Sequence, residues 1–587
     1  MSYPMRWDLD ALFRGGSESS EFKQFLGETD AYIQKWIERD QSGLSVQALV
    51  PVLETLRARQ RHAGAFVSCL VAQNVKDKQA ALLNERIQEQ SVQAQVLQLS
   101  LEDKLRQLSD EEFQALLETE ELKPSAFMLE TSRSRAQDKL DVEKENLATA
   151  LAKDGYHAWG TVYNEAVGRM EIPFEEDGET KRLSAGQLHN RLSSTERDVR
   201  KRAFEASKAA WSSEGPLFAQ TLNHLAGFRL KLYEARGWEN VLKEPLDSNL
   251  ITEATLNTMW ETITKNKPKL MPYMEKKAEL FGLDTLDFFD VAAPLPVKDG
   301  ERSTVPYEEA CELIITHFKK FSPKMADFAE MALRDGWVEA ENRPGKRPGG
   351  FCTNFPLAGE SRIFMTYDGS MSNVATLAHE LGHAYHSWCL KDQNVQSQKQ
   401  YPMSIAETAS TFAEMIVADA LVEEADSNSM KTMLLENKLS RSLAFFMNIH
   451  ARFLFETRFY EERKNGMVPQ ERLNELMEEA QREAYEEKIA SYDPNFWASK
   501  LHFHITGQPF YNFPYTFGYL FSLGIYGRAL KSEQSFEEAY IALLEDSGSM
   551  TAEALAMKHL DVDLTKPDFW QEAIDVVLGD AEEFVKK

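Results

Sequence analysis

Two histidines and a glutamate stand close together near the middle of the chain, in the segment from Thr376 to His386. Their spacing is H-E-x-x-H. On a helix, residues four apart lie one turn apart on nearly the same face, so His379 and His383 can bind one metal ion. Glu380, the next residue, is placed to take a proton from a water molecule at that metal. The pattern predicts a zinc hydrolase, and a peptidase in particular.

The surroundings of this motif favour a metal site over a coincidence. The chain has 12 histidines among 587 residues, so H-E-x-x-H should arise by chance in about one such chain in forty. Helix N-cap candidates precede the motif, and apolar residues recur through it at helical spacing. These residues are Ser370, Ser372 and Asn373, then Val374, Leu377, Ala378 and Leu381. The histidines are therefore expected on a partly buried helix, where an unpaired imidazole pair is costly. The competing interpretation is a pair of core histidines that make only hydrogen bonds.

A zinc site needs a further protein ligand, and His386 is the first candidate. It lies on the same helical stripe as His379, about 10 Å further along the axis. Three ligands strung along one straight helix do not surround a tetrahedral ion. The metzincin pattern solves this problem with a glycine three residues after the second histidine, and His386 occupies that position here. We therefore expect His386 to be a packed residue or a partner of a ligand.

Glu407 is the better candidate for the third ligand. It lies in a second expected helix, from Ser404 to Glu414, whose small residues allow another helix to approach closely. A carboxylate here completes the His₂Glu set of catalytic zinc and leaves one position open for water. Ser404 and Glu407 also have the spacing of a capping box, so Glu407 could instead cap its own helix. Glu414, two turns further on, could orient a ligand histidine or be a surface charge.

The composition limits the class of protein. A net charge of −27 argues against binding to nucleic acid or to an anionic membrane surface. Four widely separated cysteines without a C-x-x-C pair suit reduced thiols. The first sixteen residues lack a basic region followed by an apolar run, and no apolar span reaches membrane length. We expect a cytoplasmic protein; the sequence leaves its oligomeric state and its residue preference open.

The periodicity predicts a mainly helical chain with two interruptions. Helices follow one another from about residue 22 to residue 117, one of them opened by a capping box at Ser109. A short hairpin is expected from Ile172 to Leu183, and we place a soft boundary near residues 170–195. The expected N-terminal helical lobe covers residues 1–190 and is expected to limit substrate access, and the expected catalytic region covers residues 191–587.

The second interruption comes directly before the histidine helix. Residues 342–350 are rich in proline and glycine and do not form a helix interior. Residues 351–353 and 362–367 are β-branched and aromatic, and we expect strands of a small sheet beside the histidine helix. Such a strand can add an extended peptide substrate to the sheet, although a purely structural sheet fits the sequence equally well.

Taken together, these segments resemble the oligoendopeptidase F family, whose relatives include thimet oligopeptidase and neurolysin. The matching segments span nearly the whole chain and occur in the same order. They are residues 7–13, 345–352, 376–386, 406–412 and 510–519. The resemblance implies His379, His383 and Glu407 as the ligands of one Zn²⁺ per chain, and Glu380 as the catalytic base. It also implies a two-lobed helical body with a deep central channel that admits oligopeptides and excludes folded proteins.

The resemblance also gives a role to the C-terminal aromatic segment. Attack on a peptide carbonyl creates an oxyanion, which phenol or imidazole donors stabilise. In relatives, a histidine and tyrosines from this region do so; Tyr511 and Tyr515 match best, Tyr519 less well, and either His502 or His504 could serve. Packing in an aromatic-rich core is the alternative for each of them.

The combined prediction is a zinc-dependent endopeptidase that cuts internal bonds of short oligopeptides. Glu380 accepts a proton from the attacking water and delivers it to the leaving amine. Two alternatives remain at this point. One is a noncatalytic helical peptide-binding scaffold that keeps the motif as a relic, and the other is a zinc exopeptidase that trims chain ends.

Overall fold

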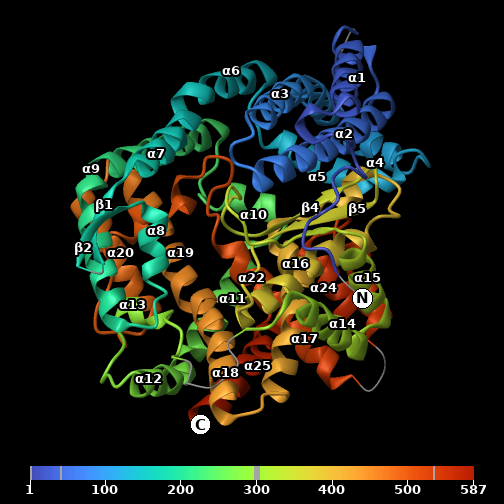
Figure 1. Ribbon diagram of the computed structural model, residues 1–587. Helices are drawn as coiled ribbons and strands as arrows, with labels where there is room; N and C mark the ends of the chain where they lie inside the picture. Colours follow the sequence, from blue (N-terminus) through green and yellow to red (C-terminus); the bar gives the residue numbers. More distant parts are fainter. Residues whose placement is uncertain (1–2, 40–42, 177, 297–303, 533–535) are drawn as a thin grey trace. The chain divides into compact units, whose positions relative to one another are not determined.

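The computed structural model describes residues 3–39, 43–176, 178–296, 304–532 and 536–587. Within these residues the chain is predominantly helical, and its strands form only a two-stranded and a three-stranded sheet (Figure 1). The prediction of a mainly helical fold with a small sheet is confirmed. Across the described ranges, no helix is both long enough and apolar enough to cross a membrane.

The chain divides into two compact units, and each is built from separated segments. Unit 1 consists of residues 1–142, 302–420 and 528–561, and unit 2 of residues 143–301, 421–527 and 562–587. The metal-binding motif lies in unit 1, and the aromatic segment with His502 lies in unit 2. The access-limiting lobe at residues 1–190 and the central channel stay predictions.

Unit 1 contains the N-terminal helices and the three-stranded sheet. Its helices are α1 (Ser20–Ile37), α2 (Val46–Gln73), α3 (Lys78–Gln107), α4 (Asp110–Leu117), α5 (Ala126–Gln137), α14 (Tyr307–Phe321), α15 (Pro323–Arg334), α16 (Met371–Cys389), residues 403–420 of α17 (Met403–Glu423), α23 (Glu537–Asp546) and α24 (Ala552–Leu560). Short 3₁₀ turns lie at Gly16–Glu18, Lys123–Ser125 and Gln396–Lys399. Side-chain caps begin many of these helices, and Ser109 and Glu112 form the predicted capping box of α4.

The sheet of unit 1 has the strand order β3-β5-β4, with β3 (Val338–Glu339), β4 (Phe351–Phe355) and β5 (Glu360–Phe364). β3 and β5 are parallel, while β4 and β5 are antiparallel and pair Phe351 with Phe364. The sheet contacts both α2 and α16. Phe355 and Phe364 join a core cluster that includes Trp7, Phe13 and Phe66. This burial fixes β4 beside the histidine helix, as predicted.

Unit 2 contains the predicted hairpin and the longest helix. The hairpin strands β1 (Ile172–Glu176) and β2 (Glu179–Leu183) are antiparallel. The helices are residues 143–152 of α6 (Val142–Ala152), α7 (Ala158–Arg169), α8 (Ala185–Arg191), α9 (Arg197–Arg236), α10 (Lys243–Asn249), α11 (Glu253–Asn266), α12 (Met271–Leu280), α13 (Phe288–Val291), the end of α17, α18 (Asn428–Leu443), α19 (Ile449–Arg463), α20 (Gln470–Ala484), α21 (Phe496–Ser499), residues 513–527 of α22 (Phe513–Lys531) and α25 (Pro567–Val585). Short 3₁₀ or π turns lie at Lys153–His157, Lys267–Leu270, Ala444–Asn448 and Leu501–His504.

A buried ion pair ties α12 to α18 inside unit 2. Lys277 Nζ lies 2.5 Å from Glu436 Oε1, and the two side chains are 0% and 1% exposed. The ammonium also donates to the carbonyl oxygen of Val291 at 2.7 Å, and Tyr273 Oη donates to the same carboxylate. Breaking a buried pair leaves an uncompensated charge, which costs far more than losing an exposed pair.

Removal of one partner of this pair should destabilise the protein strongly. We expect Lys277→Met to lower the free energy of unfolding by about 3–5 kcal/mol, because Glu436 is left charged and buried. The double substitution Lys277→Met/Glu436→Leu should recover much of this loss. The control is Lys231→Met, since Lys231 forms an exposed pair with Glu234. Thermal and urea denaturation measure the effect, and equal losses for Lys277→Met and Lys231→Met would contradict it.

Candidate metal centre

Helix α16 carries the two histidines and is fixed at its start by a cap. The Ser370 side chain accepts a hydrogen bond from the backbone N–H of Asn373, as one of the three predicted N-cap candidates should. The apolar stripe is fully buried at Val374, Leu377 and Leu381. Burial of this stripe orients the remaining face of α16, which carries the motif.

The structure brings His379, His383 and Glu407 together. One ligand atom from each lies within 4.8 Å of the other two. Glu407 Oε2 on α17 is 3.3 Å from His379 Nε2 and 3.7 Å from His383 Nε2. All three side chains are only 15–21% exposed. The two nitrogens and the carboxylate oxygen converge on one point, as the ligands of a single cation must.

This convergence requires α17 to approach α16 very closely. Gly382 lies where the helices meet: a Cβ added to it would be 2.5 Å from the carbonyl oxygen of Ala409 and 2.6 Å from Cα of Ser410. The small residues predicted on α17 therefore serve this approach. α17 begins at Met403, so Ser404 lies inside the first turn and is not its N-cap. The capping alternative for Glu407 is wrong, because this carboxylate turns toward the histidines instead.

Hydrogen bonds around the group hold its members in place. His379 Nδ1 is 3.0 Å from Glu414 Oε2, which leaves Nε2 facing Glu407. Ser410 Oγ donates to Glu407 Oε2 at 2.9 Å. Glu414 thus orients a ligand-type histidine, one of the two roles considered from its spacing.

Charge also shapes this group. Burial alone would lower the pKa of His379, but hydrogen bonds to Glu407 and Glu414 raise it to about 9. Burial, with the nearby charge of His379, lowers the pKa of His383 to about 4. Burial would raise the pKa of Glu407, yet the two histidines hold it well below its usual range. The carboxylates thus create a negative pocket that attracts positive charge.

The group opens into a cleft of 630 Å³ within unit 1. Glu380 is buried and lines this cleft together with the three converging residues. Gly350, directly before β4, lies beside it: a Cβ at this position would be 3.4 Å from Glu380 Oε1. A carboxylate, a possible cation position and the start of an edge strand therefore share one cleft. This set of groups can hold and hydrolyse a peptide.

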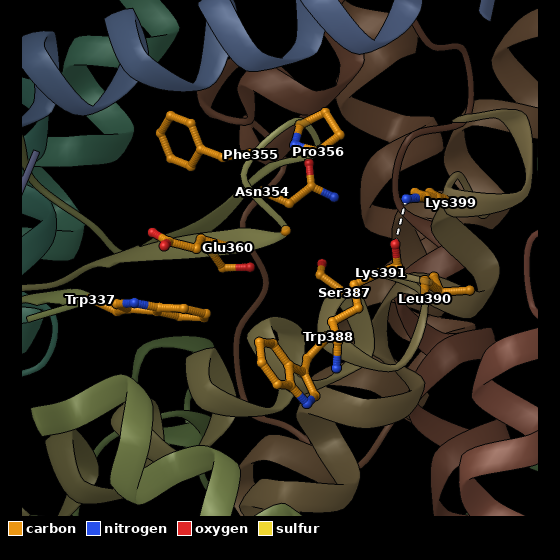
Figure 2. Close-up of a pocket in the computed structure, with 12 residues that line it drawn as sticks. Trp337, Asn354, Phe355, Pro356, Glu360, Ser387, Trp388, Leu390, Lys391 and Lys399 are labelled. Carbon is orange, nitrogen blue, oxygen red and sulfur yellow. Dashed lines mark hydrogen bonds between the residues drawn. The ribbon is translucent and has the colours of Figure 1, made fainter. Parts of the chain in front are cut away.

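A smaller cavity adjoins the cleft and shares Asn354, Ser387 and Lys399 with it. Its other lining includes Trp337 and Trp388 (Figure 2). Figure 2 also shows the Lys399 ammonium bonded to the carbonyl oxygen of Lys391, at 2.6 Å. Lys399 therefore adds a positive charge to the cleft where the cleft adjoins the smaller cavity, apart from the histidines.

His386 does not join the converging group. Its ring is fully buried, stacks on Tyr401 with a centroid distance of 3.9 Å, and bonds to Ser547 Oγ at 2.8 Å. Burial, and then the charge of His383, lowers the pKa of His386 to about 3. The expectation that His386 is a packed residue is confirmed.

In unit 2, the structure brings together His502, Tyr511 and Tyr515. The ring centroids of His502 and Tyr511 are 5.3 Å apart, and those of Tyr511 and Tyr515 are 5.8 Å apart. All three residues are partly exposed. His504 lies elsewhere: it is buried, stacked on Tyr163 at 3.8 Å, and bonded to Thr221 Oγ1. This position gives His504 a packing role.

The remaining tyrosine of the segment is also a core residue. Tyr519 is buried, and its hydroxyl lies 2.6 Å from Ser442 Oγ. Tyr519 therefore stands apart from the three grouped side chains.

The sequence reasoning missed Arg452, which fixes the ring of His502. Arg452 Nη1 donates to His502 Nδ1 at 3.4 Å and to Asn512 Oδ1 at 2.9 Å. Burial, with the charges of Arg452 and Lys500, lowers the pKa of His502 to about 4. The ring is thus neutral near pH 7, and its proton resides on Nε2 because Nδ1 accepts. No local motif marks Arg452, since it lies 50 residues before His502.

Two histidines on one helix and a carboxylate on the next, in a helical body with a small sheet, define the metallopeptidase class of hydrolases. Comparison with known proteins identifies the family. The sequence profile of "Peptidase family M3" matches residues 191–576, and that of "Oligopeptidase F" matches residues 104–172. The chain belongs to peptidase family M3, and it is a metallopeptidase.

Individual relatives agree with this assignment. The Bacillus subtilis protein "Oligopeptidase PepF" is 25% identical over 80% of this chain and 68% of its own length. "Group B oligopeptidase PepB" of Streptococcus agalactiae is 24% identical over 81% of this chain and 79% of its own length. The crystal structure of oligoendopeptidase-F from Enterococcus faecium has a TM-score of 0.71 at 19% identity, covering 96% of this chain and 99% of that one. A Chlamydophila abortus structure reaches 0.83 at 20% identity, covering 100% and 98%.

Substitution of Gly382 tests the importance of the close helix approach. We expect Gly382→Ala to lower the free energy of unfolding by about 1–3 kcal/mol, because the added methyl group meets the backbone of α17. Peptidase activity should fall as well, since Glu407 moves with α17. The matched control is Gly64→Ala on α2, where nothing lies within 4 Å and an alanine should be neutral or stabilising. Denaturation and a peptide-cleavage assay measure both effects; wild-type behaviour of Gly382→Ala would contradict this account.

Proposed function

We propose that this protein is a zinc-dependent endopeptidase that hydrolyses internal bonds of short oligopeptides. One observation carries the proposal: His379, His383 and Glu407 converge within 4.8 Å in a cleft that the Glu380 carboxylate also lines. The oligopeptidase names of the relatives support the substrate class.

The donor set fits zinc. Two imidazole nitrogens and one carboxylate oxygen are the protein ligands of many catalytic zinc sites, in which a fourth position stays open. Glu414 supports this assignment, because a ligand histidine usually bonds through its other nitrogen to a carboxylate. It is the only such group of three found in the part of the chain that the structure describes, so we expect one Zn²⁺ per chain.

Glu380 performs the proton transfers of the reaction. When bound, zinc supplies a Lewis acid that polarises the scissile carbonyl and makes water more acidic. The Glu380 carboxylate takes a proton from the attacking water and passes it to the leaving amine. The Glu380 side chain is buried and lines the cleft beside the proposed metal position. The leaving amine needs that proton, because an amide anion is too poor a leaving group at neutral pH.

His502, Tyr511 and Tyr515 are the proposed donors to the oxyanion. A neutral imidazole with its proton on Nε2 and two phenol hydroxyls can each donate a hydrogen bond to developing negative charge. The hydrogen bond from Arg452 to Nδ1 supports His502 in this role, whereas the buried, stacked position of His504 favours packing.

An extended peptide has a natural place in the cleft. β4 pairs only with β5 within the described sheet, so its other edge is available to add a strand. Backbone hydrogen bonds of this kind bind a peptide without fixing its sequence, which suits an enzyme that cuts many oligopeptides. Limitation of substrate length by the N-terminal part of the chain belongs to the same proposal.

Charge and free thiols support a proposal for the cellular location. The four cysteines are free, as expected of a protein kept in a reducing compartment, and we propose that the protein is cytoplasmic. The net charge of −27 disfavours nucleic acid and anionic membranes as partners.

The proposal predicts internal cleavage that depends on Glu380. A quenched fluorescent peptide blocked at both ends should be cut by the wild-type protein, and mass spectrometry should locate the cut inside the chain. We expect Glu380→Gln to lower kcat by about 10²–10⁴-fold, because the amide accepts no proton, while zinc content stays at one per chain. The control is Glu120→Gln, which changes an exposed carboxylate of unit 1. Release of end residues only would identify an exopeptidase, and full activity of Glu380→Gln would refute the mechanism.

Metal affinity should respond differently to the two carboxylates of α17. We expect Glu407→Ala to lose zinc, because a ligand is removed, and Glu414→Gln to bind zinc about 10–100-fold more weakly, because only a partner of His379 is altered. Titration with chelator-buffered zinc measures both. Glu423→Gln, at an exposed position on the same helix, is the control. Retention of wild-type affinity by Glu407→Ala would remove it from the ligand set.

A further inference from the structure

Two cationic side chains line the cleft beside the metal centre. Arg61 comes from α2, and Lys399 comes from the turn Gln396–Lys399. In a chain with 93 acidic and 66 basic residues, most cations can find a carboxylate. Within the described ranges, however, no carboxylate lies within 4 Å of either cationic group, although many arginines and lysines of unit 1 form such pairs. Arg61 and Lys399 therefore bring two positive charges to the cleft, and neither forms an ion pair within 4 Å with a described carboxylate.

Arg61 is held in an orientation that leaves its two Nη groups available to a ligand. Its Nε donates to Asn354 Oδ1 at 2.7 Å, and Asn354 is on β4. This bond uses only the Nε–H group of the guanidinium. Nη1 and Nη2 make no hydrogen bond to the described residues, and the residue is exposed. Two parallel N–H groups of arginine match the two oxygens of a carboxylate.

Lys399 is fixed in a similar way. Its ammonium donates to the carbonyl oxygen of Lys391 at 2.6 Å, which leaves two N–H groups for another acceptor. The side chain is partly buried, and it lines both the cleft and the smaller cavity of Figure 2, where Asn354 also lies. Asn354 is thus the residue shared by the surroundings of both cations.

The strand sets the distance between these cations and the reacting bond. Gly350 lies beside Glu380, and Asn354 is four residues further along the chain. Four residues of extended chain span about 13 Å. A peptide lying along β4 advances by the same amount per residue. A group on the substrate that meets Arg61 is therefore about four residues from the scissile bond.

We propose that Arg61, assisted by Lys399, binds a carboxylate of the substrate about four residues from the bond that is cut. The proposal rests on the proposed function, because it assumes that a peptide lies along β4. Two sources supply this chemistry: an acidic side chain at that position, or the free terminal carboxylate of a short peptide. Either source makes the enzyme selective for a class of oligopeptide.

The test moves one carboxylate along a peptide of otherwise constant sequence. Quenched peptides blocked at both ends carry Glu, Gln or Lys at each of the four positions before and after the cut, and mass spectrometry confirms where each is cut. A second pair ends at the fourth residue after the cut, with a free carboxylate or an amide. If an acidic side chain is bound, we expect about tenfold higher kcat/KM for the peptide with Glu than for the peptide with Gln at the fourth position before or after the cut. If a chain end is bound, we expect the same advantage for the peptide with a free terminal carboxylate over the peptide with a terminal amide. The preference should shrink at high salt, since exposed charges are screened.

Variants of Arg61 show whether this preference comes from the guanidinium. Arg61→Gln should remove the preference, Arg61→Lys should keep part of it, and Arg61→Glu should reverse it in favour of Lys peptides. The control is Arg14→Gln, which makes the same charge change at an exposed position of unit 1 that lines neither the cleft nor the adjoining cavity. An equal preference in wild type and Arg61→Gln, or no preference in wild type, would overturn the proposal.

A binding measurement separates this inference from the proposed function. Fluorescence anisotropy of the labelled peptides with the full-length protein, in the presence of a chelator, reports binding without turnover. A preference for the carboxylate that disappears in Arg61→Gln supports the site even if no peptide is cut, in which case only the proposed function fails. Cleavage of all peptides with equal binding and equal rates overturns the carboxylate site and leaves the proposed function standing.

Discussion

The contact between α16 and α17 at Gly382 is the constraint on which the site depends. A helix pair with ordinary side chains at its interface has axes about 8–10 Å apart, and a short carboxylate then reaches a neighbouring helix poorly. The missing side chain at Gly382 lets the backbone at Ala409 and Ser410 come within van der Waals distance. Only then do both imidazoles reach the same oxygen of Glu407. A glycine inside a helix costs about 0.5–1 kcal/mol of stability relative to alanine. In return, Gly382 allows the close approach that places Glu407 beside both histidines.

The charges around His379 favour a cation between α16 and α17. Two carboxylates, Glu407 and Glu414, lie against a single histidine in a largely buried place. Buried charges are costly unless they are paired, so this arrangement favours a cation at its centre. The same carboxylates keep His379 in one orientation. The negative pocket that favours a cation therefore also orients His379, one of the proposed ligands.

Helices, caps and strands could be predicted from the sequence, because they depend on local spacing. Contacts between distant segments could not be predicted from spacing alone. Helix α16, its cap at Ser370, the hairpin and strands β4 and β5 all follow from short-range patterns of apolar and capping residues. Glu407 was ambiguous, because its spacing from Ser404 suited a cap as well as a ligand. Only the position of α17 against Gly382 brings this carboxylate beside the histidines. His502 and His504 are two residues apart, yet tertiary packing places one among tyrosines and the other in the core. Arg61 lies far along the chain from Asn354, and Arg452 lies 50 residues from His502.

The residues proposed for catalysis and the residue proposed for substrate selectivity lie in different segments of the chain. The motif, the third carboxylate and its helix contact all lie between residues 376 and 414, so a change in any one of them disturbs the others. Arg61 comes from α2 and donates a hydrogen bond to Asn354 on β4, so both residues of this contact lie outside that region. A substitution there changes the charge of the cleft at a position outside α16 and α17. The proposed selectivity and the proposed metal centre therefore depend on different segments of the chain.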